Sequence, residues 1–392
     1  MTTPLYDLVI RGGTVIDPAQ GIHAPLDVAF ATGRVAALGA QISPSQALET
    51  LDASGQLVTP GLIDLHVHAY WGVSHYGIEP DPHFLARGAT TVVDAGSAGA
   101  ATFDGFRRYV VDVSMTRILA RLNISAQGML VDDIGELEDT RWASVPRALA
   151  AVERHRDVIA GIKVRLTKGQ VTSERAGLQP LFLAREAADA AGLSLMVHPQ
   201  DAWCDSIADV LAVLREGDLV THCFHGHRGG ILDDQGKVLP AVWAAVERGV
   251  LLDVGHGAGS FDWNVAERAL AQGLRPDTIS SDLHTYNVLG TVFDLATTVS
   301  KFLHLGLSLD EALAKVTAAP ARTLKMEDRL GTLQVGAWGD AVVFALEEGS
   351  FPLVDSHGQQ RLGRQRLAPV AVVKAGRPYQ PAPTRTTRTS AR

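Results

Sequence analysis

Short apolar segments alternate with longer amphipathic ones through the middle of the chain, residues 59–330. The apolar segments end near His68, Asp94, Ser125, Arg165, His198, His222, Val254 and Asp282. Apolar side chains recur at the helical period over residues 145–155, 178–191, 207–215, 240–248, 266–272, 291–305 and 309–318. Alternating strands and helices are typical of a parallel barrel, so the pattern predicts the α/β class and a (β/α)8 TIM barrel.

The two ends of the chain have a different pattern. Residues 1–58 and 331–380 contain short runs typical of strands, separated by turns such as the one at Gly33. The first of these pieces is too small to bury a core alone. We therefore expect both ends to meet in one small β-sandwich domain, with the barrel domain of residues 59–330 inserted between them. Residues 381–392, rich in Pro, Thr and Arg, are expected to form a disordered tail.

Composition excludes several classes of protein. The 392 residues carry a formal net charge of −8 without a block of Lys or Arg, which argues against a nucleic-acid-binding surface. The two cysteines, Cys204 and Cys223, imply no disulfide framework. No apolar run approaches a membrane span, and the first residues lack the pattern of a secretory signal. We expect a cytoplasmic protein with a small-molecule partner and no membrane or nucleic-acid partner; the sequence leaves a homo-oligomer open.

The apolar segment ending in His66-Val67-His68 carries the first candidate chemistry. Successive side chains of a strand point to opposite faces, so His66 and His68 share a face and Val67 points away. Two imidazoles at the open end of a barrel strand can bind a metal ion. A pair of hydrogen-bonded core histidines would give the same His-X-His sequence, but the position at the end of a barrel strand favours a metal site.

Other strand ends add further polar side chains. Lys163 interrupts the apolar run 161–166, His198 and His222 end the next two strands, and Asp282 ends the last. Barrel active sites lie at the C-terminal ends of the strands, so these side chains are expected to converge. A buried lysine with a lowered pKa can add carbon dioxide, and the resulting carbamate is an anion able to bridge two cations. The alternative for Lys163 is an amine that reaches solvent or pairs with an acid.

The ordered set His-X-His, Lys, His, His, Asp resembles the amidohydrolase superfamily over nearly the whole chain, and its order is that of the binuclear members. The resemblance implies two divalent metal ions, expected to be zinc, held by His66, His68, Lys163, His198, His222 and Asp282. It implies N6-carboxylated Lys163 as the bridging ligand, a hydroxide between the ions as the nucleophile, and Asp282 as the catalytic proton carrier. Segments 93–99, 161–165, 221–226 and 293–302 resemble the deacetylase branch, a relative of the dihydroorotases.

That branch implies cleavage of an acetyl ester or amide of a small carboxylic acid, such as an O-acetylated mandelate. Two alternatives stay open. One keeps the metal site but opens a cyclic amide, as dihydroorotases and hydantoinases do. The other is a catalytically inactive scaffold, against which the complete ligand set argues.

Four residues near the expected strand ends could contact substrate. Arg165 shares the face of Lys163 one step nearer the mouth, where a guanidinium suits a substrate carboxylate. An ion pair of Arg165 with Asp94 or another acid is the alternative. Tyr70, His256 and Tyr286 lie just past strand ends and are either substrate contacts or structural loop residues.

Overall fold

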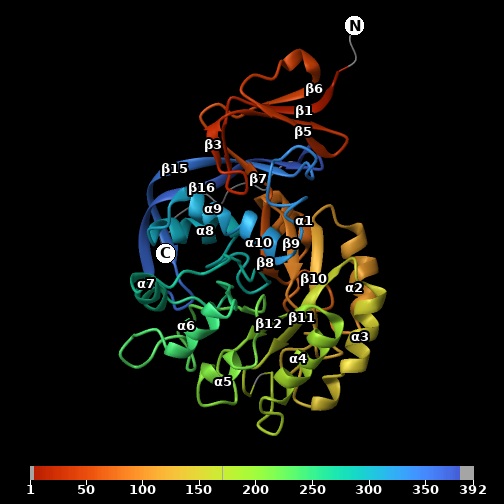
Figure 1. Ribbon diagram of the computed structural model, residues 1–392, viewed down its shortest axis with the longest axis vertical. Coiled ribbons are helices and arrows are strands. Elements are labelled where there is room, and N and C mark those ends of the chain that lie inside the picture. Colours follow the sequence, from red (N-terminus) through yellow and green to blue (C-terminus); the bar gives the residue numbers. More distant parts are fainter. Residues whose placement is uncertain (1–3, 170, 380–392) are drawn as a thin grey trace, which may run out of the picture.

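The computed structural model describes residues 4–169 and 171–379, and a parallel sheet at its centre organises them (Figure 1). Seven strands of this sheet are neighbours in chain order, from β8 to β14. They are β8 (Leu62–Val67), β9 (Ala89–Asp94), β10 (Arg117–Asn123), β11 (Ile159–Arg165), β12 (Ser194–His198), β13 (Leu219–Val220) and β14 (Leu251–Leu252). All C-terminal ends therefore meet at one edge.

Residues 278–283, here called the closing segment, complete the barrel between β14 and β8. The Val254 amide donates to the Thr278 carbonyl at 3.1 Å, and the Asp282 amide donates to the His66 carbonyl at 2.7 Å. The closing segment forms isolated bridges and no regular strand, and Asp282 within it has a left-handed backbone with φ of 49°. The predicted TIM-barrel class is confirmed, and its eighth strand is this short irregular stretch.

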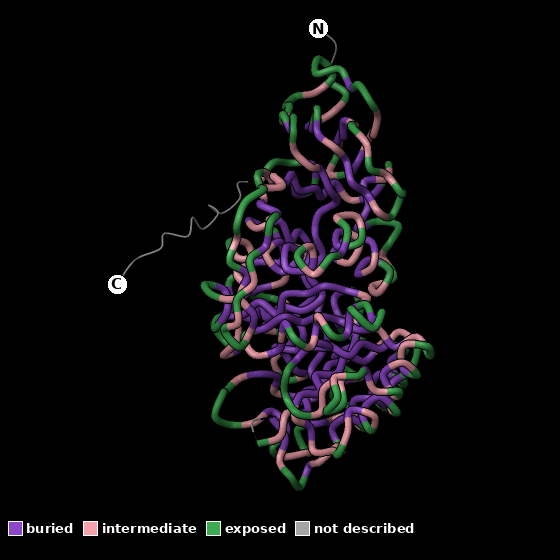
Figure 2. The backbone as a smooth tube through the Cα atoms, turned by 90° about the vertical axis from the view of Figure 1, so that its left-hand side faces the viewer, coloured by how far each residue is buried: buried purple, intermediate pink, exposed green. Residues whose placement is uncertain are grey.

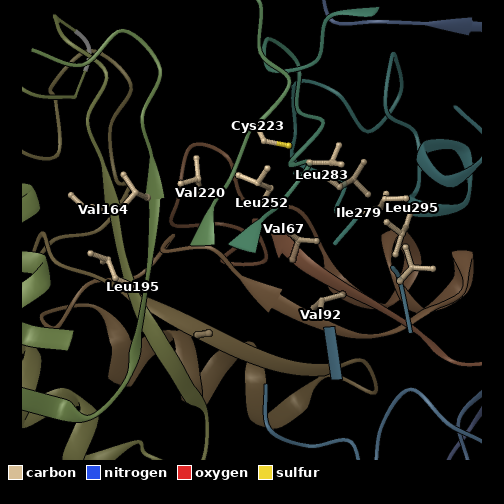
Figure 3. Close-up of a cluster of buried hydrophobic side chains, with 14 of the residues drawn as sticks. Val67, Val92, Val164, Leu195, Val220, Cys223, Leu252, Ile279, Leu283 and Leu295 are labelled. Carbon is tan, nitrogen blue, oxygen red and sulfur yellow. The ribbon is translucent and has the colours of Figure 1, made fainter. Parts of the chain in front are cut away.

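Side chains of the strands alternate between the outer face and the lumen. Figure 3 shows one apolar cluster to which successive strands contribute Val67, Val92, Val164, Leu195, Val220 and Leu252, with Cys223 among them. Met196 belongs to a second apolar cluster and pairs with Lys163 across the β11–β12 ladder, so both share the lumen face. The alternation therefore directs Lys163 and Arg165 inward while Val164 packs outward.

Helices and loops surround the barrel (Figure 1). Asp294 caps α8 by accepting from the Thr297 amide, so this helix begins at residue 295 and not at 291 as predicted. The predicted helix 309–318 is divided into α9 and α10. The helices are α1 (Pro80–His83), α2 (Phe103–Tyr109), α3 (Val145–Arg154), α4 (Gln179–Ala191), α5 (Ile207–Leu211), α6 (Pro240–Glu247), α7 (Trp263–Ala271), α8 (Leu295–His304), α9 (Leu309–Ala314) and α10 (Ala318–Thr323). Short 3-10 turns are Pro44–Gln46, Leu85–Arg87, Val111–Val113 and Thr140–Trp142.

Two further sheets lie beyond the N-terminal end of the barrel. One has the order β5-β4-β1-β6, and the other has the order β17-β16-β15-β7-β2-β3, which joins strands from both ends of the chain. Their strands are β1 (Tyr6–Arg11), β2 (Thr14–Asp17), β3 (Ile22–Pro25), β4 (Asp27–Ala31), β5 (Arg34–Gly39), β6 (Ala47–Asp52), β7 (Leu57–Pro60), β15 (Ala341–Val354), β16 (Gln360–Lys374) and β17 (Arg377–Tyr379). The division into two domains at the stated boundaries stays a prediction.

The four-stranded sheet forms one tip of the elongated molecule, and buried backbone is concentrated in the barrel (Figure 2). The long hairpin β15–β16 runs from the sheets along the barrel beside α8, where the Leu367 amide donates to Ser300 Oγ at 3.0 Å. In the part of the chain that the structure describes, no helix combines the length and the apolar character needed to cross a membrane. The predicted tail, residues 381–392, lies outside the described residues.

Candidate metal centre and active site

A cavity of about 480 Å³ opens at the C-terminal ends of the barrel strands. All six side chains predicted as metal ligands line it, together with Arg165 and Tyr286. The parallel strands explain this convergence, because the ligands lie near the C-terminal ends of β8, β11, β12 and β13 or in the closing segment, which all meet at one edge of the barrel. The predicted ligands in the lining are His66, His68, Lys163, His198, His222 and Asp282.

Three of these residues form a tight donor group. Ligand atoms of His66, His222 and Asp282 all lie within 4.8 Å of one another. Asp282 Oδ1 lies 3.3 Å from His66 Nε2 and 3.1 Å from His68 Nε2. The rings of His198 and His222 have their centroids 4.2 Å apart, so His198 adjoins the group at His222.

Hydrogen bonds at Nδ1 orient the imidazoles. His222 Nδ1 lies 2.6 Å from the Gly255 carbonyl, which can only accept, so Nδ1 carries the proton and Nε2 carries a lone pair. The Thr221 hydroxyl donates to Asp253 at 2.8 Å and thus accepts from His66 Nδ1, also at 2.8 Å. His68 Nδ1 contacts Ser97 Oγ at 2.9 Å. Outer partners of this kind aim the Nε2 atoms of metal-binding histidines.

Burial keeps these histidines neutral. It lowers the pKa of His66, His198 and His222 well below the usual 6.5, and it lowers the pKa of His68 to about 3. Burial also raises the pKa of Asp282 to about 6. Neutral imidazoles are the form that binds a metal ion.

Lys163 lines the cavity and has no exposed surface. Its Nζ atom has no hydrogen-bond partner among the described residues. Burial lowers the pKa of this amine from 10.5 to about 7. Gly96, with φ of 92°, allows the close approach, since a Cβ there would lie 2.8 Å from Lys163 Cγ. A neutral buried amine is the form that reacts with carbon dioxide.

The backbone is strained at two of the predicted ligands. His222 and Asp282 have positive φ angles of 61° and 49°, a region that non-glycine residues seldom occupy. The surrounding structure maintains the strain at Asp282, because its amide donates to the His66 carbonyl and its carbonyl accepts from Asn287 Nδ2 at 2.7 Å. Strain of this kind clusters at functional sites.

The donor set fits metal ions. The lone pairs of His66 Nε2 and His222 Nε2 and the Asp282 carboxylate share one small space, and acceptors that face each other repel unless a proton or cation lies between them. His222 Nε2 and Lys163 Nζ are buried without partners in the described structure. Nitrogen and carboxylate ligands of this type suit zinc. The histidines and Asp282 thus form a candidate metal site.

A comparison with known proteins agrees with this arrangement. The sequence profile of the Amidohydrolase family matches residues 57–378. The chain belongs to the amidohydrolase family. This amidohydrolase is 36% identical to a deacetylase of Agrobacterium fabrum over 347 residues, which covers 88% of the chain and 84% of that relative. It is 33% identical to a deacetylase of Enterococcus faecalis over 378 residues, or 95% and 99% of the two chains.

Solved structures agree with the amidohydrolase fold. A structure titled as an adenine deaminase superposes with a TM-score of 0.88 at 33% identity, covering 95% of this chain and 99% of that one. A structure titled as a dihydroorotase gives a TM-score of 0.85 at 33% identity, with coverages of 95% and 98%. The family, predicted from the ligand motifs, and the (β/α)8 barrel, predicted from the alternation of strands and helices, are both confirmed.

Arg165 of the amidohydrolase lines the cavity and pairs with Glu136, not with Asp94. Burial alone would lower the pKa of Arg165, but Glu136 and Tyr76 outweigh it and raise the pKa above its usual range. Arg165 Nη2 lies 3.5 Å from Tyr76 Oη, within reach of the cavity. The ion-pair partner of Arg165 is therefore Glu136, which the sequence analysis did not name, and the guanidinium still lines the cavity.

Two predicted substrate contacts, Tyr70 and His256, lie outside the cavity lining. Tyr70 is buried against Phe106 and donates to the Thr102 carbonyl at 3.1 Å, away from the cavity lining. β8 ends at Val67, so the alternation that places His66 and His68 inward does not extend to Tyr70. His256 stacks on Phe261 and is also absent from the lining. Tyr286 lies at the rim, 59% exposed.

Sequence reasoning missed several residues of the cavity wall. Tyr76 stacks on His68 with ring centroids 5.1 Å apart. The ring of His284 packs edge-on against that of Tyr76, with centroids 4.8 Å apart. His284 follows Asp282 by two residues, the same spacing as His66 and His68, and that signal could have found it. Tyr76 lies in a loop without periodicity, as does Glu136, which pairs with Arg165 from outside the lining, so the sequence carries no comparable signal for either.

Proposed function

We propose that this amidohydrolase hydrolyses an acetyl ester or amide of a small carboxylic acid with two bound divalent metal ions, for which zinc fits best. The observation that carries the proposal is the group of three acceptors, His66 Nε2, His222 Nε2 and the Asp282 carboxylate, beside the unpartnered Lys163 amine. Two relatives named as deacetylases, 36% and 33% identical over most of both chains, support removal of an acetyl group.

The donor positions divide between two ions. His66, His68 and Asp282 would hold one ion, His198 and His222 would hold the other, and carboxylated Lys163 would contact both. Bound ions would polarise the substrate carbonyl and make a water molecule acidic enough to attack it at neutral pH. The ligands are buried, which lowers the local dielectric and strengthens these electrostatic effects.

Asp282 is the proton carrier in this proposal. Its carboxylate takes the proton of the attacking water and gives it to the leaving amine or alcohol. Burial raises the pKa of Asp282 to about 6 in the metal-free protein, and a bound cation would lower it, so the carboxylate would be ionised and able to accept the proton at neutral pH.

Arg165 binds the substrate carboxylate at the mouth of the cavity. The Nη1 group of Arg165 pairs with Glu136, which fixes the orientation of the guanidinium plane. Its Nη2 side, near Tyr76, remains directed to the cavity. The neighbouring rings of Tyr76, His284 and Tyr286 provide an aromatic wall for the rest of the substrate.

The decisive experiment is a hydrolysis screen with zinc-loaded enzyme. N-acetyl and O-acetyl derivatives of amino and α-hydroxy acids, O-acetylmandelate among them, are assayed for release of acetate. Esterified versions without a free carboxylate serve as matched substrates, and zinc-loaded Asp282→Asn enzyme is the control for background hydrolysis. Turnover of the acids but not of their esters supports the proposal. Absence of acetate release from every acid refutes it.

A second candidate is hydrolysis of a cyclic amide. The structure titled as a dihydroorotase, with its TM-score of 0.85 at 33% identity, favours it. Dihydroorotate and hydantoins therefore belong in the same screen, where the loss of ring absorbance measures their hydrolysis. Ring opening faster than acetate release would favour this candidate. An inactive scaffold would bind no zinc after expression with added zinc.

A further inference from the structure

The tip of the β15–β16 hairpin, residues 355–359, contacts the loop that follows β14, residues 255–262 and here called the site loop. Ser356 makes the central contact. Its Oγ accepts from the amides of Ser260 and Phe261, each at 3.1 Å, and points its proton at the carbonyls of His256 and Gly257, at 3.3 and 3.1 Å. The Ser356 amide donates to the Phe261 carbonyl at 3.0 Å. One side chain thus hydrogen-bonds to backbone groups at both ends of the site loop.

Asp355 makes the hairpin tip rigid. One carboxylate oxygen accepts from the amides of His357 and Gln359, at 2.9 and 2.8 Å, and so folds the tip on itself. The other oxygen accepts from the Trp263 amide at 3.2 Å, at the start of α7. The side chain is buried, so these bonds are shielded from water. The tip is therefore a fixed support for the site loop.

Lys301 of α8 attaches the same loop from its other side. Its buried Nζ lies 2.6 Å from His256 Nε2, 2.7 Å from the Val354 carbonyl and 2.9 Å from the Thr291 carbonyl. The amine thereby links the hairpin, the site loop and the chain beyond the closing segment. His256, which lies outside the cavity, acts as an anchor of the loop.

The site loop lies directly against Asp282. The Gly257 amide donates to the Ser281 carbonyl at 3.0 Å. Gly257 has φ of 58°, and a Cβ there would lie 2.5 Å from Asp282 Oδ2, so the backbone itself forms the wall behind this oxygen. Ala258, Gly259 and Ser260 line the cavity. A displacement of the site loop would therefore leave the Asp282 carboxylate without its support.

We propose that Ser356 is a positioning residue for Asp282, acting through the site loop from a hairpin that belongs to the β-sheets and not to the barrel. Its effects on catalysis and on metal affinity rest on the proposed function, whereas its effect on loop order does not. Residues that orient metal ligands from behind commonly change affinity or activity by about 10–100-fold.

Three variants test the proposal. Ser356→Ala removes the hydroxyl, Ser356→Thr retains it, and Arg366→Ala breaks an ion pair with Glu347 farther along the same hairpin without touching the site loop. Each is measured as full-length protein by amide hydrogen exchange, by zinc affinity in competition with a chelator, and by kcat and KM on the best acetylated acid.

We expect Ser356→Ala to accelerate exchange over residues 255–262 and 278–283, and to weaken zinc binding and lower kcat about tenfold with little change in KM. Ser356→Thr and Arg366→Ala should stay near wild type. Wild-type exchange and zinc affinity in Ser356→Ala would overturn the proposal, as would equal losses in Arg366→Ala. If wild-type enzyme hydrolyses no acetylated acid, the proposed function is wrong, and the exchange measurements still decide the role of Ser356.

Discussion

Replacing Lys163 by methionine should make the metal-free protein more stable, although it removes a proposed metal ligand. The wild-type amine has no exposed surface and no hydrogen-bond partner in the described structure. Methionine fills a similar volume and has no charge to desolvate. The gain should depend on pH, because burial lowers the pKa of Lys163 from 10.5 to about 7.

The sign follows from proton binding in the two states. Below pH 7 the amine is protonated in both states, and the folded protein bears the full cost of the buried charge. A shift from 10.5 to about 7 corresponds to an upper bound on the order of 5 kcal/mol at about 1.4 kcal/mol per unit. Between pH 7 and 10.5 only the unfolded state holds the proton, so wild-type stability rises with pH. The advantage of Lys163→Met should shrink by about 2 kcal/mol between pH 7 and 8.5.

The assay is urea unfolding of chelator-treated protein in buffers free of carbon dioxide, at pH 6.5, 7.5 and 8.5. Lys237→Met is the matched control, because Lys237 is exposed and its amine is hydrated in both states. We expect no pH-dependent difference between that control and wild type. A constant difference between Lys163→Met and wild type across this range would refute the reasoning, and so would a destabilised Lys163→Met protein at pH 6.5.

Three further predictions concern activity. Asp282→Asn should lower kcat by about 10²–10⁴ while zinc content, measured by elemental analysis, falls much less; full activity would exclude Asp282 as the proton carrier. Arg165→Met should raise KM for carboxylate substrates and lower the free energy of unfolding by about 3–5 kcal/mol, because it strands the buried Glu136 carboxylate. Adding Glu136→Gln to that variant should recover stability but not KM; recovery of both would place Arg165 outside substrate binding. Chelation should abolish hydrolysis and zinc should restore it, and activity that survives complete removal of zinc would exclude a metal requirement.

The sequence predicted the parts of the site that depend on regular strands. His66 and His68 could be placed on one face because side chains alternate strictly along a strand, and Lys163 could be placed in the lumen for the same reason. Each of these inferences needs only the strand period and the rule that barrel sites lie at the C-terminal ends. The cavity lining agrees with them residue by residue.

The sequence predicts the position of a side chain less well where strands end. Tyr70 has the parity of His66 and His68, but β8 stops at Val67 and the chain turns. His256 follows β14, and the positive φ angles of Gly255 and Gly257 on either side rotate it out of the alternation. Glu136 reaches Arg165 from a long loop whose path depends on tertiary packing. No local pattern specifies such contacts.

Both the closure of the barrel and the position of the Asp282 carboxylate depend on the closing segment. Asp64 accepts from the amide and hydroxyl of Ser281, and Asp253 accepts from the hydroxyls of Thr278 and Ser280, so side chains hold this junction where a regular ladder is missing. Asp282 lies within the same six residues. The residues that close the barrel and the proposed proton carrier therefore belong to one stretch of backbone. A descendant protein that lost the activity would still need most of this stretch to keep the barrel closed.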